Sequence, residues 1–204
     1  MEYILSVVLF AISSSVTPGP NNIMVMTSGL NFGVRKSIPL LSGICIGFAL
    51  MLLLVGLGFA QLFNLFPGLN LLIKVAGTLY LLYLACLIAR SGTVGQSGRH
   101  AQPFGFIKGV LFQWINAKAW VVAIGAISAF TTVGDQFTQQ NLTIATTFLI
   151  VSFPCVGVWL MFGSILRRYL DNVTYMRWFN LCMAALLIIS VLPVISEIIV
   201  SYAG

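Results

Sequence analysis

The strongest chemical signal in the chain is a run of six residues near the middle of its first apolar segment, Thr17, Pro18, Gly19, Pro20, Asn21 and Asn22. Each proline lacks a backbone N–H and prevents the helical hydrogen bond at its position, which leaves carbonyl groups unpaired. Hydrocarbon offers these groups no water, so such a break is stable only where it faces protein or an aqueous cavity. The motif therefore predicts a pathway for a solute rather than a simple membrane anchor.

The same motif has the parts of an anion-binding site. Pro20 suits the first turn of a new half-helix, and Thr17 or Gly19 can form the cap or the sharp turn before it. The N-terminus of a half-helix carries a charge of roughly +0.5 and several unpaired N–H groups. It can therefore receive the carboxylate of an amino acid at the membrane midplane, with the side-chain amides of Asn21 and Asn22 beside it. The alternative is that Pro18 and Pro20 only kink a span.

A second polar cluster, residues 113–118, lies in the fourth apolar segment. Lys118 follows Lys108 by ten residues, about 15 Å along a helix, which is too far for its side chain to reach the membrane surface. An ionisable residue at this depth indicates function, either as a partner for the substrate carboxylate, which we favour, or as a proton carrier. A lysine that only holds broken-helix carbonyls is the alternative. Asn116 can cap a half-helix here, and Trp114 lies beside the predicted break.

The composition requires a membrane protein. Hydrophobic residues make up 59% of the 204 residues, charged residues make up 7%, and the mean hydropathy is +1.04. These values exclude an ordinary soluble domain. Six apolar runs, each near the length of about 20 residues that spans a bilayer, occupy Tyr3–Ser28, Ile38–Phe63, Leu69–Ala89, Phe104–Phe130, Leu142–Leu166 and Trp178–Val200.

The positive charges predict the orientation. Basic residues concentrate in the first, third and fifth connections between these spans, at Arg35, Lys36, Arg90, Arg99, Lys108, Arg167, Arg168 and Arg177. By the positive-inside rule these connections are cytoplasmic, so both termini lie on the periplasmic or external side. The net charge of +6 is thereby accounted for without a nucleic-acid partner. A basic surface that binds a protein partner is the alternative.

The six spans divide into two halves, residues 1–90 and 104–204, joined by a polar loop at residues 91–103. A tandem repeat with an odd number of spans must be inverted, because its second copy starts on the opposite side of the membrane. We therefore predict one all-α polytopic transmembrane domain, residues 1–204. It has six transmembrane helices, arranged as two inverted three-helix repeats in which helices 1 and 4 are broken.

Several motifs resemble those of the LysE/RhtB family of bacterial amino-acid exporters. Residues 17–22, followed by residues 31–37 and 42–47, resemble the family's opening signature, and residues 74–84, 104–106 and 116–119 are similar to its third and fourth spans. The resemblance covers essentially the whole chain. One departure is Asn116-Ala117-Lys118, where the family usually has Asn-Pro-Lys. A residue other than proline also occurs in the branch that exports cysteine and O-acetylserine, which this chain resembles most.

The resemblance implies export of small neutral amino acids and derivatives, such as cysteine, O-acetylserine, threonine or homoserine, across the bacterial inner membrane. It also implies alternating access coupled to proton exchange, although no acidic residue lies in a span centre to carry the proton. We assign substrate binding to Thr17, Pro18, Gly19, Pro20, Asn21, Asn22, Trp114, Asn116 and Lys118. The sequence leaves open the exact substrate and whether the chain works as a homo-oligomer.

Other functional classes find less support in the sequence. The single histidine, the lack of a GxSxG motif and the lack of paired acids in a span argue against an enzyme, and we expect neither a cofactor nor a metal centre. Two alternatives to an amino-acid exporter remain. One is a membrane scaffold subunit without transport activity, and the other is an exporter of another small solute or of a metal ion.

Overall fold

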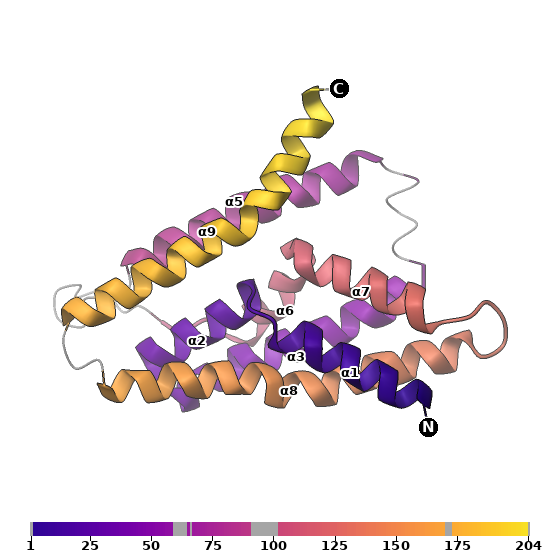
Figure 1. Ribbon diagram of the computed structural model, residues 1–204, viewed down its shortest axis with the longest axis horizontal. Coiled ribbons are helices and arrows are strands. Elements are labelled where there is room, and N and C mark those ends of the chain that lie inside the picture. The colour runs from indigo at the N-terminus through magenta and orange to yellow at the C-terminus, as the bar shows by residue number, and fades with distance from the viewer. Residues whose placement is uncertain (1, 59–64, 66, 91–101, 170–172, 204) are drawn as a thin grey trace.

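The computed structural model of the protein describes residues 2–58, 65, 67–90, 102–169 and 173–203 (Figure 1). Every regular element that it describes is an α-helix. In chain order the helices are α1 (Glu2–Val16), α2 (Pro20–Phe32), α3 (Val34–Gly56), α5 (Pro67–Arg90), α6 (Phe106–Ile115), α7 (Ala117–Phe130), α8 (Phe137–Tyr169) and α9 (Val173–Ala203). The predicted loop at residues 91–103 lies outside the described residues except for Gln102 and Pro103.

The prediction of an all-α polytopic membrane protein is confirmed. Helices α3, α5, α8 and α9 are each long and apolar enough to cross a membrane. Helices α1 and α2 meet at an angle of 57°, α6 and α7 meet at 73°, and there are up to six spans if each bent pair forms one. Breaks in the first and fourth predicted helices are therefore present. Both halves of the chain have the same order of elements, and the inverted relation between them stays a prediction.

The two breaks have different local causes. At the first, the backbone N–H of Thr17 still bonds to the carbonyl of Ser13, at 3.3 Å, and Pro18 has no N–H with which to continue the helix. Helix α2 then starts with Pro20 as its first residue. At the second break no proline is needed. Asn116 adopts an extended conformation, with φ −86° and ψ 102°, and caps the helix that follows it.

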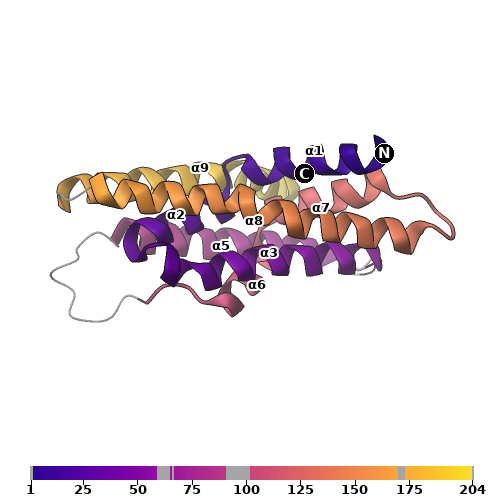
Figure 2. The same ribbon diagram turned by 90° about the horizontal axis from the view of Figure 1, so that it is seen from below.

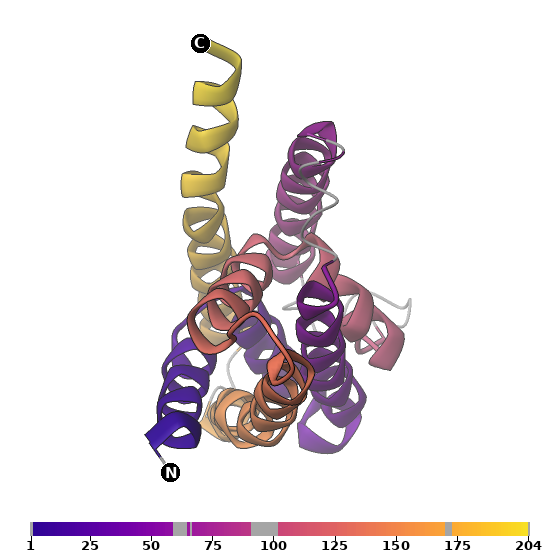
Figure 3. The same ribbon diagram turned by 90° about the vertical axis from the view of Figure 1, so that its right-hand side faces the viewer.

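The helices form a bundle with a splayed edge. The most extensive helix contacts are those of α2 with α8, of α3 with α6 and α8, and of α5 with α9. Two apolar clusters fill the bundle, and both α3 and α8 contribute to each of them. Figure 3 shows the C-terminal end of α9 and the N-terminal end of α5 diverging from each other and from the remaining helices. At the breaks, Asn22 and Asn116 are buried, whereas Val16, Thr17 and Pro18 are exposed.

Pairs of glycines allow two of these helix contacts to be close. A Cβ atom on Gly163 of α8 would overlap the carbonyl of Met26 in α2, and one on Gly29 of α2 would overlap the carbonyl of Leu160 in α8. The same reciprocal arrangement joins α3 and α6 through Gly43 and Gly109. Small residues at such contacts let helix backbones approach each other, which favours helix association in a membrane.

Gly163→Ala is therefore expected to destabilise the protein by about 1–3 kcal/mol, because either the new methyl group or the backbone of α2 must move. Gly157→Ala is the matched control on the same helix, since a Cβ there meets no atom within 4 Å. It should leave stability unchanged or raise it slightly, because alanine is the better helix former. The measurement is the apparent midpoint of thermal unfolding in detergent. Equal midpoints for the two variants would contradict this account of the α2–α8 contact.

Candidate functional site

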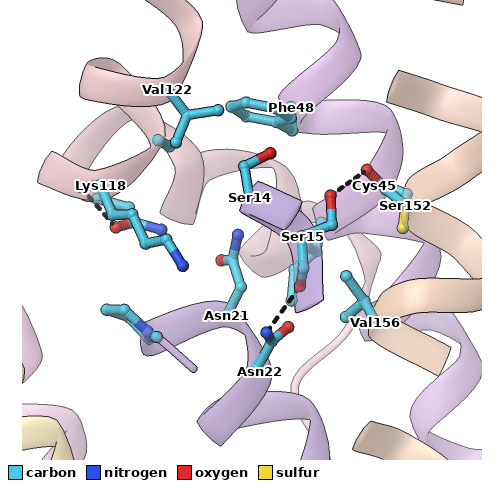
Figure 4. A pocket seen from close by; sticks show the side chains of 15 residues that line it. Ser14, Ser15, Asn21, Asn22, Cys45, Phe48, Lys118, Val122, Ser152 and Val156 are labelled. Atoms are coloured by element: carbon cyan, nitrogen blue, oxygen red, sulfur yellow. Dashed lines mark hydrogen bonds between the residues drawn. The ribbon is translucent and has the colours of Figure 1, made fainter. Parts of the chain in front are cut away.

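A cavity lined by both polar and apolar side chains lies where the two breaks meet (Figure 4). About 50 Å³ of it is open to water, enough for a few water molecules. Its lining comes from both breaks and from α3 and α8, and consists of Ser14, Ser15, Gly19, Pro20, Asn21, Asn22, Ile44, Cys45, Phe48, Asn116, Lys118, Ala119, Val122, Ser152 and Val156.

Two side chains bind the carbonyl groups that the first break exposes. The side-chain nitrogen of Asn22 donates to the carbonyl of Ser15 at 2.8 Å and to that of Thr17 at 3.0 Å. Trp159 of α8 donates through its indole N–H to the carbonyl of Val16 at 3.3 Å. These bonds replace the ones that the helix would have made, which is the condition for a break to persist away from water.

Lys118 connects the second break to the first. Its side chain leaves the first turn of α7, and its Nζ atom donates to the carbonyl of Thr17 at 2.8 Å. Nζ also lies close to Gly19, the residue before α2. A Cβ atom placed on Gly19 would be only 3.1 Å from Nζ. The ammonium group is thus placed beside the N-terminus of α2 and at the edge of the cavity. The prediction that Lys118 turns into the bundle is confirmed.

A pair of amides forms a further link between the two broken helices. Asn21 of α2 donates to Oε1 of Gln113 in α6 at 3.0 Å, and Gln113 donates back to Oδ1 of Asn21 at 3.1 Å. Gln113 also donates to the carbonyl of Gly109 at 3.1 Å, and its side chain has 0% exposure. Both amides are thereby fixed in orientation. Sequence reasoning did not assign Gln113 to the site, although it opens the polar cluster at residues 113–118.

Hydrogen bonds among residues 114–120 stabilise the second break. Oδ1 of Asn116 accepts from the backbone N–H of Lys118 at 3.2 Å and so caps α7. The indole N–H of Trp120 donates to the carbonyl of Trp114 at 2.9 Å, and the two rings pack edge to face with centroids 5.9 Å apart. Trp114 is not among the residues that line the cavity. Its ring packs on Trp120 and against the apolar cluster to which α1, α3, α7 and α8 contribute.

The electrostatic character of the cavity is positive. The first helical bond of α2 runs from the N–H of Ile23 to the carbonyl of Gly19 at 3.0 Å, so the N–H groups of Asn21 and Asn22 precede it. No side-chain cap bond satisfies this helix end in the described structure. The N-terminus of α7 and the ammonium group of Lys118 add to the same field. Since none of the residues that line the cavity is acidic, its surroundings suit an anionic group.

The cavity includes most of the residues that the sequence indicated. Gly19, Pro20, Asn21, Asn22, Asn116 and Lys118 line it, whereas Thr17, Pro18 and Trp114 lie outside the lining. The carbonyl of Thr17 accepts from Lys118. Sequence reasoning missed the hydroxyl groups of Ser14, Ser15 and Ser152. The three consecutive serines at positions 13–15, just before the first break, were an available signal. Ser152 had no comparable signal in the sequence.

Comparisons of the chain with known proteins show its family. The family model described as LysE type translocator matches residues 12–195. The chain is 31% identical to the cysteine/O-acetylserine efflux protein of Salmonella typhimurium strain LT2 over 182 residues, which cover 88% of this chain and 90% of that relative. It is 30% identical, with the same coverage, to the protein of that description from Escherichia coli strain K12. No solved structure matches the chain at a significant level. The chain is therefore a multi-pass membrane protein that belongs to the LysE family of translocators.

Proposed function

We propose that this protein exports small neutral amino acids of the cysteine and O-acetylserine type out of the cell across the bacterial inner membrane. The observation that carries the proposal is the position of Lys118, an intramembrane cation that reaches the carbonyl of Thr17 and the start of α2. A cation and two half-helix N-termini around one cavity provide the contacts that the carboxylate of an amino acid needs. The relatives named above are described as efflux proteins for these two compounds.

The lining of the cavity supports a small and neutral substrate. Phe48, Val122 and Val156 bound part of it with apolar side chains, so large or charged side chains would be poorly accommodated. A second positive charge would have no carboxylate partner among the lining residues. Lysine and arginine are accordingly expected to be poor substrates, because a buried unpaired ammonium or guanidinium group is costly.

Transport in this proposal proceeds by alternating access driven by exchange for protons. The cavity measures about 50 Å³, which is room for a few water molecules. Transport of a larger solute therefore calls for movement of the surrounding helices. Rocking of one three-helix unit against the other would open the breaks to each side of the membrane in turn.

The distribution of charged residues supports the direction of export. The C-terminal ends of α5 and α8 and the N-terminal end of α9 lie at one end of the molecule, whereas the N-terminus and the turn between α7 and α8 lie at the other (Figure 2). The first end carries Arg90, Arg167 and Arg177, and the second carries Asp135. By the positive-inside rule the first end is cytoplasmic.

The function is tested with everted membrane vesicles, whose outer surface is the cytoplasmic face. An imposed pH gradient, acidic inside, should drive labelled cysteine and O-acetylserine into vesicles that contain this protein, above the external concentration. Collapse of the gradient should abolish accumulation, and lysine should not accumulate. Uptake equal to that of vesicles without the protein would instead favour a scaffold subunit.

The same preparation needs a control for orientation. A single cysteine in place of Arg35, in a background without native cysteines, should react with an impermeant thiol reagent in everted vesicles and not in intact spheroplasts. Reaction only in spheroplasts would place the basic end outside the cell and reverse the proposed direction.

A further inference from the structure

The hydrogen bonds of Asn22 fix which way its amide faces. Only the nitrogen of an amide carries hydrogen, so its two bonds to the carbonyls of Ser15 and Thr17 place Nδ2 against the first break. The oxygen, Oδ1, must then face the other way. Figure 4 shows this oxygen on the side of Val156, with Ser15 and Ser152 above it in the view.

This oxygen is an acceptor without a donor. Asn22 is 3% exposed, and Oδ1 has no hydrogen-bond partner among the described residues. Buried polar atoms in native proteins are nearly always paired, so one left unpaired in the lining of a cavity calls for a ligand that supplies the hydrogen. Because Nδ2 already makes two hydrogen bonds, only Oδ1 is left to bind a ligand. The ligand group must therefore be a hydrogen-bond donor.

Two serine side chains lie above this oxygen in the view of Figure 4. Oγ of Ser15 in α1 and Oγ of Ser152 in α8 are 3.5 Å apart. A hydrogen bond of this length is weak, so either hydroxyl group can bind a ligand instead. Both serines line the same cavity as Asn22. An ammonium group carries three N–H donors and no acceptor, so it can donate to Oδ1 and to hydroxyl oxygens of the same lining.

We propose that Oδ1 of Asn22 binds the α-ammonium group of the substrate while Lys118 and the N-terminus of α2 bind its carboxylate. This assignment rests on the proposed function and adds to it the protein atom that recognises the amino end of the substrate, Oδ1 of Asn22. A substrate bound in this way has its two backbone charges separated along the cavity, which leaves the side chain to distinguish one amino acid from another. N-acylated amino acids lack the cationic donor and are excluded.

The test uses three competitors that differ at the amino group. L-cysteine, 3-mercaptopropionate, which lacks the amino group, and N-acetylcysteine each compete with labelled cysteine for uptake into everted vesicles. In the wild-type protein the inhibition constants of the two analogues should exceed that of cysteine by about tenfold or more, as expected for loss of a charge-assisted hydrogen bond. In Asn22→Ala the ratio between 3-mercaptopropionate and cysteine should fall toward one, because cysteine alone loses a partner.

Asn21→Ala is the matched control, since it removes the neighbouring amide, whose oxygen is already paired with Gln113. It should keep the wild-type ratio even if it lowers transport. Asn22→Ser is a second variant whose hydroxyl can still donate to a break carbonyl, and the ratio should fall there too.

The possible failures are distinguishable. Competition by 3-mercaptopropionate as strong as that of cysteine in the wild-type protein overturns the inference without any variant. An unchanged ratio in Asn22→Ala or Asn22→Ser overturns it as well. Absence of cysteine uptake by the wild-type protein would refute the proposed function itself.

Discussion

Lys118→Met is expected to abolish efflux while leaving the protein inserted in the membrane. The variant removes a charge from the interior of the membrane, which favours insertion. It also removes the ammonium group that donates to the carbonyl of Thr17 and that we assign to the substrate carboxylate. Loss of a hydrogen bond to a charged group should lower transport by about a hundredfold. The measurement is cysteine efflux normalised to the amount of protein in the membrane.

Two further lysine variants sharpen this result. Lys118→Arg should also fail, because Gly19 lies close to the side chain, with a Cβ there 3.0 Å from Cδ, and leaves little room for a planar guanidinium group. Lys108→Met is the matched control on the same predicted span, since Lys108 is exposed and its ammonium group lies 5.0 Å from the ring centroid of Phe104. It should transport nearly as well as the wild-type protein. Normal transport by a well-inserted Lys118→Met variant would make Lys118 a purely structural residue.

The second large effect is expected from the amide pair between α2 and α6. Gln113→Ala should destabilise the protein by about 1–3 kcal/mol, because it leaves the amide of Asn21 without its partner in a half-buried position. Efflux should fall as well, because the pair holds the two breaks in register around the cavity. Asn21→Ala should have an effect of similar size. Both properties are measured, as the apparent midpoint of unfolding in detergent and as efflux per inserted protein.

The double variant tests whether the two amides act together. If each single change already removes the shared hydrogen bonds, Gln113→Ala combined with Asn21→Ala should cost little more than either change alone. Effects that simply add would show that Asn21 and Gln113 contribute independently, and would contradict a link between the two breaks.

The sequence determined the class of fold and the existence of the first break. Apolar runs of about 20 residues indicate membrane-spanning helices. Proline removes a helical hydrogen bond at its own position, whatever the tertiary structure. Both effects are local, so they can be read along the chain. The depth of Lys118 within an apolar run was equally visible, and it indicated that this side chain turns inward. The resemblance to the LysE/RhtB family rested on the same local motifs, and the family is confirmed.

The second break was harder to predict because its cause is a cap rather than a proline. Asn116 ends one helix and starts another by bonding to the backbone N–H of Lys118. An asparagine can do this anywhere that the chain already turns, so its type alone does not locate a break. The structure shows a bend of 73° here with alanine, not proline, at the first position of α7.

Only the tertiary structure decided which side chains share the site. The bond between Lys118 and Thr17 joins residues 101 positions apart, and the one between Asn21 and Gln113 joins residues 92 positions apart. Such pairings depend on how helices rotate and cross, which their hydrophobic pattern does not specify when nearly every face is apolar. For the same reason the sequence did not predict that Trp114 packs on Trp120 rather than lining the cavity. Nor did it predict that Ser152 of α8 is part of the lining. Glycines also let particular helices approach closely, α2 with α8 through Gly29 and Gly163, and α3 with α6 through Gly43 and Gly109, and this too depends on how the helices cross.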